Sequence, residues 1–129
     1  MAKNDKPIHY AIVGIATEQF AIVEENYLDD SPNIEIATTL KFGTELENDV
    51  LVVGSNFVFQ IDSKPFLVIE GRVSFKIAKG DWEIFKVPDQ SKYSITQDFA
   101  THLAAITIGT TRGILHAKTE GTRFNHFVI

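Results

Sequence analysis

Residues 94–129 read SITQDFATHLAAITIGTTRGILHAKTEGTRFNHFVI, and this stretch decides the fold of the chain. Its first four residues, Ser94 to Gln97, match a capping box, in which a glutamine stands three residues after an N-cap serine. Gly121 stands where glycine commonly follows the end of a helix. Together these signals predict one long helix over residues 95–119, at the C-terminal end of the chain.

The apolar residues of this expected helix cover a broad arc. One face contains Ile95, Phe99, Leu103 and Ile106, and an adjacent face contains Ala100, Ala104, Ile108 and Leu115. An arc this wide predicts burial on more than one side. Since one small sheet covers one side, we expect the other side to meet a second subunit of a homo-oligomer. The residues expected in this oligomer interface are Phe99, Leu103, Ile106, Ile108, Gly109, Arg112, Gly113 and Leu115.

Gly109 and Gly113 are unfavourable inside a helix, by about 1 kcal/mol each relative to alanine. Their spacing would let a neighbouring backbone approach the helix closely. The alternative is that the two glycines have this spacing by chance and serve no close contact.

Four segments with strand-like patterns precede the helix, at residues 8–23, 33–42, 50–61 and 66–77. The last alternates most clearly, with Leu67, Ile69 and Val73 on one face and charged residues on the other. Short links join the segments, and such links are typical of antiparallel pairs because parallel pairs need long crossovers. We therefore expect a single α+β domain over residues 1–129: a four-stranded antiparallel meander followed by a long C-terminal helix packed on the sheet.

Composition excludes several classes of function. The chain has 129 residues and no cysteine, so disulfides, thiolate metal sites and cysteine nucleophiles are absent. Its formal net charge of −5 repels phosphate backbones and disfavours nucleic acid as a partner. The start, MAKNDKP, lacks the apolar run of a signal peptide, and no run reaches the roughly 20 apolar residues of a membrane helix. We expect a cytoplasmic protein.

Nothing in the sequence matches a catalytic or metal-binding motif. On one helix, His102 and His116 would lie about 21 Å apart along the axis, too far to share a metal ion. Most carboxylates fall in expected loops, where solvation is the ordinary state of a charge. A G-x-S-x-G motif and a Gly-rich phosphate loop are both missing. We therefore expect no enzymatic activity, no catalytic residues, no metal and no cofactor.

With this order of elements, the chain resembles the SecB-like protein-export chaperone family. IHYAIVGIATEQFAIVEEN at residues 8–26 resembles the first strand of that family with its mid-strand break. KPFLVIEGRVSFKI at residues 64–77 resembles the fourth strand. HLAAITIGTTRGILHAKTEGTRF at residues 102–124 resembles the helix of that family, which has an arginine near its middle and a Gly-Thr pair just after its end. The likeness covers residues 8–127.

The resemblance implies an ATP-independent holdase that binds unfolded preproteins in apolar grooves and passes them to the SecA motor. Members of the family form tetramers, as dimers of dimers, and need no cofactor. With the resemblance, the phenylalanine-rich strands and the apolar crossover segment 80–93 imply a client groove. The residues it would contain are Phe57, Phe59, Phe66, Val68, Phe75, Trp82, Phe85 and Val87.

Two features depart from the family pattern. Family members carry acidic residues in the first strand that contact SecA, whereas Gln19 and Val23 occupy those positions here, which leaves SecA open as a partner. The family usually continues into a second helix, whereas this sequence stops at Ile129, as a shorter member or a truncated chain would. For the phenylalanines, plain core packing is the alternative to a groove. The alternative function is a non-enzymatic interaction or ligand-binding domain, such as a toxin–antitoxin-associated chaperone.

Overall fold

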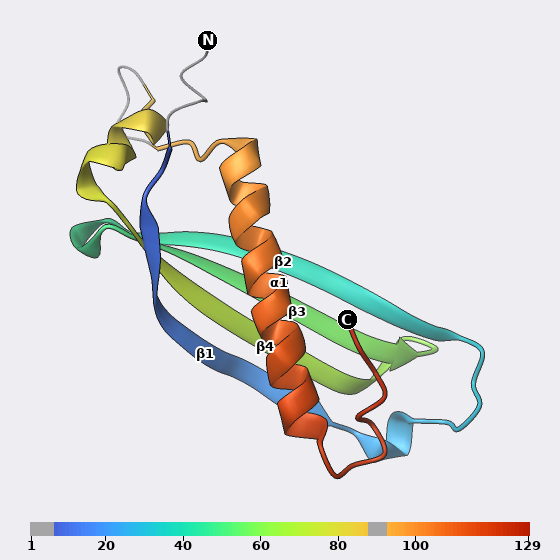
Figure 1. The fold of residues 1–129 in the computed structure, drawn as a ribbon. Helices are drawn as coiled ribbons and strands as arrows, with labels where there is room; N and C mark the ends of the chain where they lie inside the picture. The colour runs from blue at the N-terminus through green and yellow to red at the C-terminus, as the bar shows by residue number, and fades with distance from the viewer. Residues whose placement is uncertain (1–6, 88–92) are drawn as a thin grey trace.

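The computed structural model describes residues 7–87 and 93–129, and in this part of the chain four strands and one long helix are present (Figure 1). The strands are β1 (Tyr10–Ile22), β2 (Ile34–Glu45), β3 (Val50–Ile61) and β4 (Lys64–Ile77). They form one antiparallel sheet, and the helix α1 (Gln97–Thr119) packs on one of its faces. The predicted α+β class, with its four strands and C-terminal helix, is confirmed.

The strand order is β1-β4-β3-β2, so the expected meander covers three of the four strands. β2, β3 and β4 follow one another as neighbours, as their short links predicted. β1 instead pairs with β4. The link after β1 includes a short 3-10 helix, η2 (Glu24–Asn26), and it is long enough to pass the β3–β4 hairpin. The N–H of Val23 donates to the carbonyl of Phe66 at 2.8 Å, which holds the start of this link beside β4 and gives a Greek-key order.

Side chains at both ends of α1 explain where the helix begins and ends. Thr96 is the N-cap, and its hydroxyl accepts a hydrogen bond from the N–H of Phe99 at 3.4 Å. Asp98 lies in the first turn, while His116 and Lys118 lie in the last turn, where each charge suits the helix dipole. Beyond the end, Gly121 has a φ of 81°, a conformation that glycine adopts without strain.

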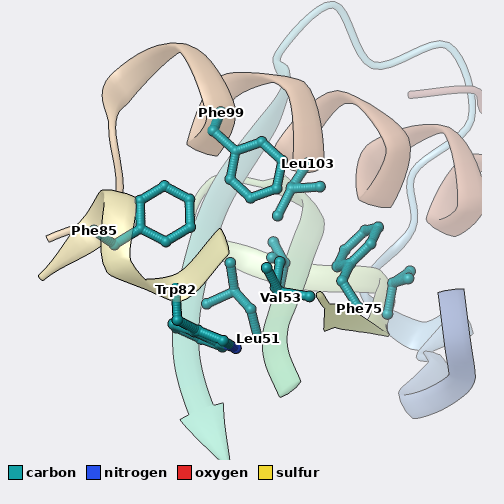
Figure 2. Packing of buried hydrophobic residues seen from close by; sticks show 9 residues of the cluster. Leu51, Val53, Phe75, Trp82, Phe85, Phe99 and Leu103 are labelled. Carbon is teal, nitrogen blue, oxygen red and sulfur yellow. The ribbon is translucent and has the colours of Figure 1, made fainter. Parts of the chain in front are cut away.

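The core lies between α1 and the sheet, in two apolar clusters. The first joins β3 and β4 to Phe99 and Leu103 of α1, and to Trp82 and Phe85 of a further 3-10 helix, η4 (Lys79–Phe85) (Figure 2). The second surrounds Phe66 near the other end of α1 and contains five phenylalanines or isoleucines of β3 and β4 with Leu115 and Phe124. Between the clusters, the buried hydroxyls of Ser55 and Thr111 lie 2.6 Å apart and hydrogen-bond across the helix–sheet contact.

Gly71 of β4 lies where α1 approaches the sheet closely. A Cβ atom there would collide with the hydroxyl of Thr111 and would lie 3.4 Å from the Cδ1 of Ile114. Thr111 is completely buried and is held by Ser55, so it has little room to move away. We expect Gly71→Ala to lower the free energy of unfolding by about 1–3 kcal/mol, the usual cost of overpacking, as measured by urea unfolding.

Gly54→Ala is the matched control for this prediction. Gly54 lies on the neighbouring strand β3, but the nearest atom to an added Cβ there is the carbonyl oxygen of Gly71, at an ordinary 3.8 Å. The control should keep the stability of the original protein. An equal loss in both variants would show that alanine in these strands, and not the contact with Thr111, is the cause.

Candidate binding surface

α1 covers the middle of the sheet and leaves its two edges bare on the same face. The helix crosses the strands obliquely (Figure 1) and packs mainly on β3 and β4, the two central strands. A helix with its side chains is about 10–12 Å across, whereas neighbouring strands lie about 4.8 Å apart, so one helix covers about two strands. The helix-facing side chains in the middle of β1 and along most of β2 are therefore left without a layer above them, whereas Tyr10, Phe20, Ile22 and Ile34, near the strand ends, pack against the core.

On β2, the uncovered residues form a row that we name the β2 strip: Ile36, Leu40 and Phe42. Directly opposed residues of antiparallel strands point to the same face, and these three oppose Phe59, Ser55 and Val53 of β3. Those three partners are buried in the core, whereas Ile36, Leu40 and Phe42 are 47%, 41% and 46% exposed. The apolar face of the sheet thus continues past the edge of the helix.

A second row, the β1 strip, lies on the other side of α1 and consists of Ile12, Val13 and Ile15. Ile12 opposes Phe75 and Ile15 opposes Val73, and both partners are wholly buried in the core. Ile12 and Ile15 are nevertheless 46% and 58% exposed. Val13 lies at a bulge between them and is also exposed. Two apolar strips therefore flank the helix, one along each edge strand.

The residues predicted for client binding lie inside the molecule. Seven of the eight are buried in the single chain, and Val87 is half-buried: Phe57, Phe59, Phe66, Val68, Phe75, Trp82 and Phe85 are the seven. A register shift in the β3–β4 pairing leaves Phe66 without an opposing residue, and its ring packs among Tyr27, Phe124 and Phe127. As packed here, the seven buried side chains form part of the core of the single chain.

The crossover segment closes the core at the start of α1. Trp82 and Phe85 point into the first cluster, where the ring of Phe85 stacks on Phe99 with centroids 5.5 Å apart (Figure 2). The buried carboxylate of Asp81 accepts a hydrogen bond from the backbone N–H of His9 at 2.7 Å, which fixes η4 beside the start of β1. The predicted crossover region also includes residues 88–92, which lie outside the described residues.

The residues predicted for the oligomer interface divide between two faces of α1. Phe99, Leu103 and Leu115 are buried against the sheet, within the same chain. Ile106 and Ile108 are half-buried, and Gly109, Arg112 and Gly113 are exposed. An added Cβ at either glycine would meet nothing within 4 Å, so neither glycine serves a close approach inside the chain.

Sequence reasoning missed that the end of the chain folds back beside α1. Nε of Arg112 donates to the carbonyl of Ile129 at 2.7 Å. Phe127 and Val128 line a shallow surface cavity of about 340 Å³ together with Gly109, Arg112, Gly113 and His116. The aromatic residues after Gly121 were the signal in the sequence from which this contact could have been predicted. The end of the chain thus covers part of the wide apolar arc of the helix, without a second subunit.

The face of the sheet opposite α1 carries a network of charged and polar side chains. Nε of Arg72 lies 3.1 Å from a carboxylate oxygen of Glu18, and Nζ of Lys41 lies 3.7 Å from one of Glu70. Nδ2 of Asn56 also donates to Glu70, at 3.2 Å. Ion pairs and hydrogen bonds of this kind are typical of an ordinary protein surface. The exposed apolar residues of the sheet are instead concentrated on the helix side, in the β1 and β2 strips.

Two further findings bear on the kind of site. Within residues 7–87 and 93–129, no group of three or more histidine, aspartate or glutamate side chains is arranged to hold a metal ion. In the same part of the chain, the one long helix is not apolar enough along its length to cross a membrane.

Comparison with known proteins leaves the function open. The sequence matches no protein-family model and no curated protein. Among solved structures, it is similar to the crystal structure of a protein of unknown function from Streptococcus agalactiae, at 14% sequence identity and a TM-score of 0.46. That similarity covers 96% of this chain and 97% of the other. The geometry of the two strips is therefore the basis for a functional proposal.

Proposed function

We propose that this protein is an ATP-independent holdase chaperone that binds extended segments of non-native polypeptides in the cytoplasm. The observation that supports the proposal is the pair of apolar strips flanking α1. Apolar side chains gathered in contiguous patches, as distinct from scattered single residues, usually mark a site for another protein. The resemblance to SecB-like chaperones suggests preproteins as clients, and transfer to SecA is a prediction of that resemblance alone.

The strips suit weak and unselective binding of a flexible chain. Ile36, Leu40 and Phe42 are each about half exposed. Fully burying a large apolar side chain stabilises by about 1.5–3 kcal/mol, so covering the exposed half contributes about 1 kcal/mol per residue. A single strip therefore gives modest affinity. Binding two strips with one client raises the overall affinity through effective concentration.

Charge favours the same kind of client. The chain carries 17 acidic and 12 basic side chains, and its net charge is −5. A field of this sign attracts polypeptides that carry excess lysine and arginine, and it speeds their encounter with the surface. Apolar side chains of such a segment would then pack on the strips.

The test is suppression of aggregation, with reduced and unfolded lysozyme as the basic client and light scattering as the measurement. The original protein should suppress aggregation at near-stoichiometric amounts without ATP. Replacing Ile12 and Ile15 together by serine removes the ends of the β1 strip. We expect this double variant to bind the client about thirtyfold more weakly, because about 1 kcal/mol is lost at each of the two positions.

Leu28→Ser is the matched control for the double variant. Leu28 is 57% exposed, as Ile15 is 58% exposed, but it lies in the link between β1 and β2 and belongs to neither strip. The control should suppress aggregation as the original protein does. The proposal fails if the original protein does not suppress aggregation, or if the double variant keeps full activity with an unchanged far-UV spectrum.

A further inference from the structure

The surface cavity between α1 and the end of the chain has the size and the lining of a small-molecule site (Figure 1). Its volume is about 340 Å³, and binding pockets for small molecules commonly have volumes of roughly 300–1,000 Å³. Such pockets are lined mainly by apolar groups, with a few polar groups that fix the ligand. The cavity shares no residue with the β1 strip or the β2 strip, so a ligand bound here is separate from client binding.

The wall of the cavity opposite α1 is held in place by the core. Phe124 is buried, and the ring centroid of Phe127 lies 5.2 Å from that of Phe66. Nδ2 of Asn125 donates to the carbonyl of His116 at 3.0 Å, which ties the same segment to α1. Both sides of the cavity are therefore fixed before a ligand enters, and such preorganisation lowers the cost of binding.

Gly109 and Gly113 keep the α1 side of the cavity open. Glycine is unfavourable inside a helix, and an added Cβ at either position would meet nothing within 4 Å. Packing within the chain therefore requires neither glycine. A larger side chain at either position would extend into the cavity, whereas the glycines leave a flat surface of helix backbone along it.

Arg112 brings a positive charge to this cavity and has donors to spare. Its Nε donates to the carbonyl of Ile129 at 2.7 Å. The two Nη nitrogens carry the other four N–H donors of the guanidinium, and within residues 7–87 and 93–129 they have no hydrogen-bond or ion-pair partner. A pair of free Nη groups matches the two oxygens of one carboxylate, which it binds through two parallel hydrogen bonds.

The other two arginines of the chain are already paired with carboxylates. Nε of Arg72 lies 3.1 Å from an oxygen of Glu18, and Nη1 of Arg123 lies 3.3 Å from one of Asp29. The chain carries 17 acidic side chains, yet none in the described part of it forms an ion pair with Arg112. The carboxylate that would complete Arg112 is therefore one that a ligand can supply.

We propose that this cavity binds a small amphipathic carboxylate, whose charged group pairs with Arg112 and whose apolar body lies between Phe127, Val128 and the glycine surface of α1. A bare inorganic anion would leave the apolar wall uncovered, and a neutral apolar molecule would leave Arg112 unpaired. The net charge of −5 disfavours ligands that carry more than one negative charge. Together these features select an apolar monocarboxylate.

Phenylacetate is the probe, and protein-observed NMR of the full chain is the measurement. Phenylacetate should shift the amide signals of Gly109, Gly113 and Val128, with a dissociation constant on the order of 1 mM, as is usual for a ligand of this size. Phenylacetamide has the same shape without the charge and should bind about tenfold more weakly or worse. Acetate, which lacks the ring, should leave these signals unchanged. Equal shifts from phenylacetate and phenylacetamide, or shifts confined to other residues, would overturn the proposal.

Arg112→Gln tests the role of the guanidinium. This variant should bind phenylacetate about tenfold more weakly or worse, because a neutral side chain replaces the charged donor. Lys118→Gln is the matched control, since it removes one positive charge from the same helix at an exposed residue that does not line the cavity. The control should keep the dissociation constant within about twofold, because exposed charges at a distance are screened by salt. An equal loss in both variants would show general attraction of anions and no site at Arg112.

Gly113→Leu tests the cavity independently of folding. Leucine favours a helix more than glycine does, so the Tm of the variant should stay the same or rise. The new side chain fills the cavity, so binding of phenylacetate should fall about tenfold or more. Unchanged binding would refute the proposed location. Light scattering completes the test, because an oligomer of the original protein that Gly113→Leu dissociates would show that a second copy occupies the cavity in place of a ligand.

Discussion

Replacing Phe66 by alanine is expected to lower the free energy of unfolding by about 3–5 kcal/mol, the usual cost of removing a buried phenylalanine ring. Phe66 is wholly buried. Its ring centroid lies 5.0 Å from that of Tyr27, 5.2 Å from Phe127 and 6.3 Å from Phe59, so one substitution removes these three aromatic contacts and a fourth with Phe124, at 6.2 Å, and leaves a cavity. Denaturant unfolding followed by circular dichroism measures the loss.

Phe42→Ala provides the contrast within the same sheet. Phe42 belongs to the β2 strip and is 46% exposed, so its truncation should cost less than about 1 kcal/mol of stability. Phe66 was expected from the sequence to contact clients, whereas its packing makes it a core residue. A Phe66→Ala variant that kept its stability and lost client capture would restore the client role.

Leu103→Ala should lower the free energy of unfolding by about 2–5 kcal/mol, and the loss should not depend on protein concentration. Leu103 is wholly buried in the first cluster, where it lies beside Phe99 and above Val53 and Phe75 of the sheet (Figure 2). All of these contacts belong to one chain. Unfolding curves at two protein concentrations a hundredfold apart therefore measure the same loss.

The dependence on concentration separates a core residue from an interface residue. Stability that comes from association rises with protein concentration by mass action, so a loss at a subunit contact would change between the two curves. Leu28→Ala, the same substitution at a side chain that is 57% exposed, should change stability by less than about 0.5 kcal/mol. A concentration-dependent loss for Leu103→Ala would return this residue to an oligomer interface.

Local patterns predicted the elements of this fold well. The alternation in residues 66–77 identified β4, and Gly121 marked the end of α1. The predicted capping box at Ser94 was wrong, because Thr96 is the N-cap and α1 begins at Gln97. Local patterns did not reveal that β1 pairs with β4, because strand order depends on contacts between segments far apart in the sequence. Link length alone favoured the nearest strand, β2.

The candidate site was harder to predict than the fold, for a physical reason that Phe42 and Phe57 illustrate. Both stand on the apolar face of a strand, and the alternation around each is the same. Phe57 lies on a central strand under α1, whereas Phe42 lies on an edge strand beyond it, so one is buried and the other is exposed. A sequence pattern marks the apolar face, but the width of the helix determines which part of that face stays open.

The pairing of β1 with β4 also sets the order in which the chain can fold. β2, β3 and β4 join through short hairpin links, so their contacts close small loops at low entropic cost. β1 has no such partner nearby, since its contact with β4 closes a loop that contains the whole of β2 and β3. Contacts of this range form late in folding. Because β1 is synthesised before β4, it must wait, with its isoleucines unpaired, until β4 has been made.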